Sequence, residues 1–182
     1  MKEYISDKLK KELIGVYPTD TLYGVLGSAL SKKAVEKIYK AKKRDENVPF
    51  LVLISKIKDL EIFGISLSLE KEKLLKKYWP GKVTVVLPLY KKFVSKFTYI
   101  HRGKGTIAFR FPKKKSLIAL LNKTGPLVAP SANISGLPPS KNLKEAKAYF
   151  GDSVDFYVAG KISKKASKII SLVGEKPEIL RK

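Results

Sequence analysis

The chain has 182 residues, 44% of them hydrophobic, which is enough for one domain with a sizeable core and short for two. Lysine and arginine number 38 against 16 acidic residues, and the formal charge of +22 favours polyanions without specifying which kind. The absence of cysteine excludes disulfides and thiol catalysis, and the lack of a signal-peptide core or an apolar run of about 20 residues favours a cytoplasmic protein without membrane spans.

The first half of the chain alternates between predicted strands and helices. A short apolar run predicts a first strand, and a serine is well placed as the N-cap of the helix that follows. A buried strand and a second helix come next, and that helix stops at a Trp-Pro-Gly breaker. These elements are the strand Leu13–Tyr17, the helix capped by Ser31 with Val35, Ile38 and Tyr39 on one face, the strand Phe50–Ile54 and the helix Leu69–Tyr78.

The second half is richer in predicted strands. We expect strands at Val83–Leu89, Thr106–Phe111, Pro126–Ala129, Val154–Val158, Ile169–Val173 and Glu178–Arg181, and helices at Ser116–Asn122 and Leu143–Phe150. Strands that alternate with helices early and predominate later predict an α/β (α+β) fold, in which helices pack on a mixed sheet.

Arginine is rare in this chain, and its rarity is informative. Of the 38 basic residues, 34 are lysine, and we expect most of these lysines to be solvated, including Lys10, Lys32, Lys71 and Lys164. Where lysine is the default, an arginine indicates a site that needs a planar, bidentate fork. The four arginines are Arg44, Arg102, Arg110 and Arg181.

Two early segments carry polar residues that suit an anionic ligand. In Tyr17–Gly24, two threonines and an aspartate follow a strand near an expected helix start, where unpaired backbone amides suit a carboxylate or phosphate. A simple strand-to-helix cap explains the same residues. In Ala41–Pro49, Lys42 and Arg44 can grip a polyphosphate or can form a solvated, basic helix end.

Two later segments leave a similar choice open. Alternation along the strand places Thr106, Ala108 and Arg110 on one side, where the arginine either meets solvent or anchors an anion. Ser131 and Asn133 follow an apolar strand, which is typical of a ligand-contacting loop and equally of a plain turn.

In this order and spacing, the segments resemble the YrdC-like family of threonylcarbamoyl-AMP synthases. The hallmark is K-x-R followed far downstream by S-x-N, and the resemblance runs from about Leu13 to the C-terminus. The matching motifs are Lys42/Arg44, Ser131/Asn133, Y-P-T-D-T-x-Y-G at 17–24, Trp79-Pro80-Gly81, and A-x-R-x-P at 108–112.

The resemblance implies a single YrdC-like domain over residues 1–182, with a twisted sheet of antiparallel and parallel strands, flanking helices and a large concave basic cavity. It implies catalytic roles for Lys42 and Arg44. The threonine-binding residues that it implies are Thr21, Arg110, Ser131 and Ser167. The implied ATP-binding residues are Lys42, Arg44, Thr106, Asn133, Ser140 and Arg181.

The resemblance also implies a reaction, in which a nucleotidyltransferase condenses L-threonine, bicarbonate or CO2, and ATP to threonylcarbamoyl-AMP and pyrophosphate. Mg2+ would accompany ATP without a protein metal site, and a transfer enzyme acting on tRNA would consume the product. Direct RNA contact is left open by the charge alone. Two alternatives remain: a non-enzymatic module that binds double-stranded RNA, and a divergent homologue that binds nucleotide or carbamoyl compounds in another pathway.

Overall fold

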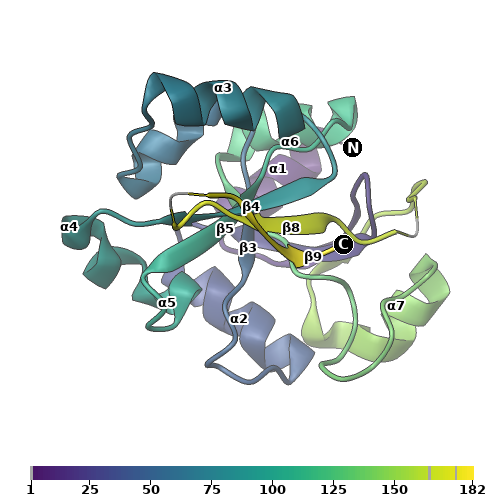
Figure 1. Ribbon diagram of the computed structural model, residues 1–182. Coiled ribbons are helices and arrows are strands. Elements are labelled where there is room, and N and C mark those ends of the chain that lie inside the picture. Colours follow the sequence, from purple (N-terminus) through teal and green to yellow (C-terminus); the bar gives the residue numbers. More distant parts are fainter. Residues whose placement is uncertain (1, 164, 175) are drawn as a thin grey trace.

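The computed structural model describes residues 2–163, 165–174 and 176–182, and Figure 1 shows a central sheet with helices above and below it. The strands are β1 (Gly15–Pro18), β2 (Tyr23–Ser28), β3 (Leu51–Leu53), β4 (Val83–Pro88), β5 (Thr106–Arg110), β6 (Leu127–Val128), β7 (Phe156–Tyr157), β8 (Lys168–Ser171) and β9 (Glu178–Arg181). The α-helices are α1 (Lys2–Lys10), α2 (Lys32–Lys42), α3 (Leu69–Tyr78), α4 (Lys91–Val94), α5 (Thr98–His101), α6 (Lys115–Thr124) and α7 (Leu143–Phe150).

The sheet is mixed in strand direction. Over the described residues its order is β7-β1-β2-β6-β3-β5-β4-β8-β9. The pairs β1–β7, β3–β5 and β4–β8 are parallel, and the other neighbours pair antiparallel. The predicted α/β class, with helices flanking a mixed sheet, is therefore confirmed.

Two apolar clusters fix helices on opposite faces of this sheet. Successive side chains of a strand point to opposite faces, so adjacent strand residues join different clusters. On one face, α1 and α6 pack with Leu26 of β2 and Leu53 of β3. On the other, α2 and α7 pack with Val25 and Val52. Figure 1 shows the first two helices above the sheet and the second two below it.

The same alternation of side chains places polar residues on one face of β4 and β5. Ile107 and Phe109 of β5 are buried in the core. Thr106, Ala108 and Arg110 therefore point to the other side, as the sequence pattern predicts. The neighbouring strand β4 follows the same rule, with Val85 and Leu87 in the core and Thr84 and Val86 on the side of Arg110.

Several predicted element boundaries agree with the structure. The helices predicted at 69–78 and 143–150 are α3 and α7 with the same bounds. Ser31 caps α2 as predicted, and its hydroxyl accepts a hydrogen bond of 3.1 Å from the backbone N–H of Ala34. A serine cap works in this way because the first turn of a helix has unpaired N–H groups.

Four of the elements given above were not predicted: α1, β2 and the four-residue helices α4 and α5. The helix α1 contributes few apolar side chains, chiefly Ile5 and Leu9 one turn apart, so its period is hard to see. The strand β2 carries two glycines, which usually mark turns. Tight packing explains Gly27, because a Cβ there would lie 2.9 Å from Cδ1 of Ile38 on α2.

The charge is spread over the surface of the described residues. Lys10, Lys32 and Lys71 are exposed, as predicted, whereas Lys164 lies outside the part of the chain that the structure describes. None of the helices within the described residues is both long and apolar enough to cross a bilayer.

Candidate functional site

A cavity of about 350 Å³ lies on the polar face of β4 and β5. Its wall is completed by the loop after β1, the segment after β6, and residues before and within β8. Most residues predicted to contact substrate, although far apart in the sequence, line this one cavity. They are Thr21, Arg44, Thr106, Arg110, Ser131, Ser167 and Arg181.

The charge of this cavity comes from arginine. Among the described residues that line it, the charged side chains are Arg44, Arg110 and Arg181. The fourth arginine, Arg102, lies elsewhere and forms an ion pair of 2.8 Å with Glu36. A concave site with three guanidinium groups and no lining carboxylate attracts an anion.

Arg110 is the most deeply buried of these arginines. Its side chain is 3% exposed, and its Nη1 donates a hydrogen bond of 2.6 Å to Oδ1 of Asp20. Burial lowers the pKa of Arg110, while the charge of Asp20 opposes that shift. Within the described part of the chain, its buried Nε has no hydrogen-bond partner. One nitrogen of the guanidinium is thus paired with Asp20, the buried Nε retains an unused donor, and the residue lines the cavity.

Arg44 approaches the cavity from the loop after α2. Its Nε donates to the carbonyl of Val48 at 3.3 Å, and its guanidinium lies 5.3 Å from the ring centre of Phe50. Burial lowers the pKa of Arg44, against the opposing influence of Tyr39 and Asp45. Carbonyl and ring contacts hold the side chain without neutralising it, so its charge stays available to a ligand.

Paired hydroxyls line the rest of the wall. Thr19 and Thr21 place their Oγ1 atoms 3.0 Å apart, and Oγ of Ser167 lies 2.9 Å from Oγ1 of Thr84. Arg181 donates from Nη2 to the carbonyl of Ser167 at 2.7 Å. Thr19 and Thr84 line the cavity but were not predicted as site residues. Two sequence features could have identified them. Thr19 lies inside the Pro-Thr-Asp-Thr segment, and Thr84 alternates with core residues of β4.

The other three predicted site residues, Lys42, Asn133 and Ser140, do not line the cavity. The ammonium of Lys42 donates to the carbonyls of Ser131 and Asn133 at 2.5 and 2.6 Å. Oδ1 of Asn133 accepts from Oγ of Ser131 at 2.7 Å. The hydroxyl of Ser140 is buried and has no partner among the described residues. Lys42 and Asn133 therefore shape the loop that presents Ser131, and their contact with substrate stays a prediction.

Lys42 is unusual for a lysine because only 1% of it is exposed. Burial, together with the smaller influence of the nearby charge of Arg44, lowers its pKa to about 7. The ammonium thus lies close to its titration point at neutral pH.

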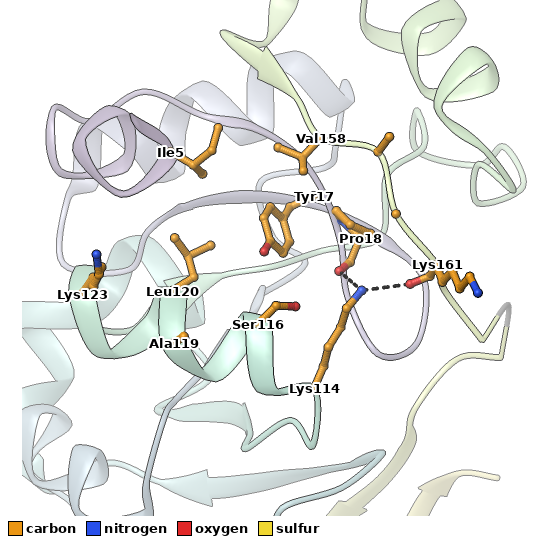
Figure 2. Close-up of a pocket in the computed structure, with 12 residues that line it drawn as sticks. Ile5, Tyr17, Pro18, Lys114, Ser116, Ala119, Leu120, Lys123, Val158 and Lys161 are labelled. Atoms are coloured by element: carbon orange, nitrogen blue, oxygen red, sulfur yellow. Dashed lines mark hydrogen bonds between the residues drawn. The ribbon is translucent and has the colours of Figure 1, made fainter. Parts of the chain in front are cut away.

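A second cavity, of about 420 Å³, lies between α1, α6 and the segment 158–161. Figure 2 shows its apolar wall, with Ile5, Leu120 and Val158 around the ring of Tyr17. None of the predicted substrate-contacting residues lines it. The larger cavity is therefore separate from the arginine-lined site.

Comparisons with known proteins agree with the motif resemblance. Residues 7–182 match the family model Sua5_yciO_yrdC, which carries the description "Telomere recombination". A Bacillus subtilis protein named threonylcarbamoyl-AMP synthase is 36% identical over 135 residues, which are 73% of this chain and 38% of that protein. A Pyrococcus abyssi protein of the same name is 32% identical over 168 residues, 91% of this chain and 48% of that protein.

A solved structure gives the same relationship in three dimensions. The crystal structure of P. abyssi Sua5 complexed with L-threonine superimposes with a TM-score of 0.89 at 29% identity, and the match covers 99% of this chain and 53% of that chain. This chain thus spans about half the length of the P. abyssi proteins that it matches. The matched residues, the fold and the shared motifs lead to one conclusion: the chain belongs to the Sua5/YciO/YrdC family.

Proposed function

We propose that this protein is a threonylcarbamoyl-AMP synthase, an enzyme of the nucleotidyltransferase class that makes the activated intermediate for tRNA modification. Relatives that bear this enzyme's name support the proposal. The observation in this chain that carries it is the arginine-lined cavity, in which a buried Nε of Arg110 lacks a partner within the described residues. A related protein of the same fold has been solved with L-threonine.

The threonine site would be built around Arg110. A carboxylate can bind the cavity-lining guanidinium of Arg110, because the hydrogen bond to Asp20 uses Nη1 alone and the group has five N–H donors. Thr21, Ser131 and Ser167 line the same cavity and offer hydroxyls to the amino and hydroxyl groups of threonine.

The ATP site would use the remaining cations of the cavity. Arg44 and Arg181 can bind phosphate oxygens, and Thr106 adds a hydroxyl on the same wall. Lys42 and Asn133 would act on the nucleotide chiefly by holding the Ser131 loop. The backbone N–H of Ser140 donates to the carbonyl of Ala132 at 3.0 Å, and a contact of its hydroxyl with nucleotide stays part of the proposal.

The chemistry needs two bond-forming steps. The amine of threonine attacks bicarbonate or CO2, which gives a carbamate and, from bicarbonate, a water molecule. A carbamate oxygen then attacks the α-phosphorus of ATP, and pyrophosphate leaves. The arginines would hold the two anionic reactants together and offset the negative charge, so catalysis rests on positioning and electrostatic stabilisation.

Mg2+ would enter this site with ATP. Among the described residues, no three histidine, aspartate or glutamate side chains lie together in a group suited to a metal ion. Phosphate oxygens and water are ligands that Mg2+ commonly keeps in nucleotide sites. When bound, the ion neutralises phosphate charge while Arg44 and Arg181 orient the triphosphate.

The product is a mixed anhydride that reacts readily with water, so its proposed partner is a transfer enzyme acting on tRNA. A cytoplasmic location belongs to the same proposal. Direct RNA contact does too, because the charge of +22 favours polyanions in general. A purely RNA-binding module is less well supported, because phosphate binding does not require a concave, arginine-lined cavity.

One assay tests the proposed function. The purified protein should release pyrophosphate from ATP when Mg2+, bicarbonate and L-threonine are all present, and it should form an adenylate. Omitting threonine, replacing it with serine, and omitting bicarbonate are the matched controls. Release of ADP and phosphate, or a rate that does not depend on threonine, would contradict the proposal.

A further inference from the structure

Asp20 is held from two sides beside the candidate site. Its Oδ1 accepts the hydrogen bond of 2.6 Å from Nη1 of Arg110, and its Oδ2 accepts one of 3.2 Å from the backbone N–H of Lys113. The side chain is 9% exposed. With both oxygens bound, the carboxylate cannot rotate freely.

This pair is better explained by orientation than by stability. Removing two charges from water is costly, and a buried ion pair often fails to recover that cost. Arg110 adds a second cost, because its buried Nε has no partner within the described residues. A donor left unpaired beside a cavity is expected where a ligand supplies the missing acceptor.

We propose that Asp20 is a positioning residue for substrate recognition. By binding Nη1, Asp20 fixes the plane of the Arg110 guanidinium, so that this cavity-lining group is held in one orientation toward the carboxylate of the amino-acid substrate. Asp20 thereby contributes to the preference for a free carboxylate over an uncharged analogue. This inference rests on the proposed use of threonine, and it assigns to Asp20 no contact with the substrate.

The loop that carries Asp20 has a separate support. The ammonium of Lys114 donates to the carbonyls of Pro18 at 2.8 Å and Lys161 at 2.9 Å, as Figure 2 shows. It also reaches the carbonyl of Thr19 at 3.4 Å. Lys114 therefore supports the loop through its backbone and makes no hydrogen bond to Arg110. Its charge also interacts with that of Asp20, so its removal is a control for a disturbance of the loop and of the charge beside Asp20.

The test compares binding of L-threonine and L-threonine amide to the full chain by titration calorimetry. The parent should bind the acid more tightly than the amide. Asp20→Ala should lower threonine affinity by about tenfold or more and reduce the acid-over-amide preference, with ATP affinity nearly unchanged. Asp20→Asn keeps the shape of the side chain, and its threonine affinity should lie between those of the parent and of Asp20→Ala. Lys114→Met should shift both ligands by the same factor and keep the preference.

The outcomes separate this inference from the proposed function. Failure of the folded parent to bind threonine would overturn the proposed function and this inference with it. Intact binding by the parent, with an unchanged preference in both Asp20 variants, would overturn this inference alone. A gain in threonine affinity in Asp20→Ala would identify Asp20 as a competitor for Arg110, and the positioning role would again be wrong. If Asp20→Ala does not fold, Asp20→Asn decides the question.

Discussion

Raising the pH should stabilise this protein through Lys42. In the unfolded chain, a lysine keeps its proton up to its ordinary pKa of 10.5, whereas burial, with the nearby charge of Arg44, lowers the pKa of the folded ammonium to about 7. Between these two values the unfolded state binds more protons than the folded state, so the free energy of unfolding rises with pH. From these pKa values, the gain between pH 7.5 and 9.5 is on the order of 2 to 3 kcal/mol.

Loss of the proton need not disrupt the site. Lys42 uses two hydrogen bonds, to the carbonyls of Ser131 and Asn133. A neutral amine still has two N–H donors, so both bonds can persist above the folded pKa. The two carbonyls do favour the charged form, and they oppose the effect of burial. The size of the pH effect therefore measures which of these two influences is stronger.

The assay is urea unfolding at several pH values and constant salt. Lys42→Met removes the titrating group while retaining an unbranched side chain of similar length, and it should lose the rise in stability with pH. Lys40→Met is the matched control, because Lys40 lies on the same helix but is exposed. If the free energies of unfolding of the parent and of Lys42→Met change in parallel from pH 7.5 to 9.5, Lys42 stays charged, and the pKa shift expected from burial is wrong.

Two further predictions concern the site and the surface. Arg110→Lys keeps the charge but loses the fork, so it should weaken threonine use by about tenfold or more, whereas Arg44→Ala should mainly weaken ATP use. Titration of each substrate in the pyrophosphate assay tests this, and an Arg110 variant impaired only for ATP would reverse the assignment. Changing the exposed Lys10, Lys32 and Lys71 to Gln should leave synthesis nearly intact and reduce the salt dependence of any RNA binding. A large loss of synthesis in this folded triple variant would show that distant charge assists the reaction.

Local patterns in the sequence determined several features of this protein. Alternation along β5 predicted that Thr106, Ala108 and Arg110 share a face, and the cavity lies on that face. The ends of α3 and α7 followed from the residues that stop them, the Trp-Pro-Gly segment and Gly151. The scarcity of arginine was also informative, since three of the four arginines line one cavity. These inferences succeed because periodicity, caps and side-chain chemistry act over short stretches of chain.

The tertiary structure decided how those residues are used. Lys42 and Arg44 form one motif in the sequence, yet Arg44 lines the cavity while Lys42 binds carbonyls about 90 residues away along the chain. The pairing of Asp20 with Arg110 joins the loop after β1 to the end of β5 in the same way. Likewise, the glycine-containing strand β2 is fixed by close packing against α2. Such contacts depend on burial and on pairing between distant segments, and no local pattern records which groups will meet.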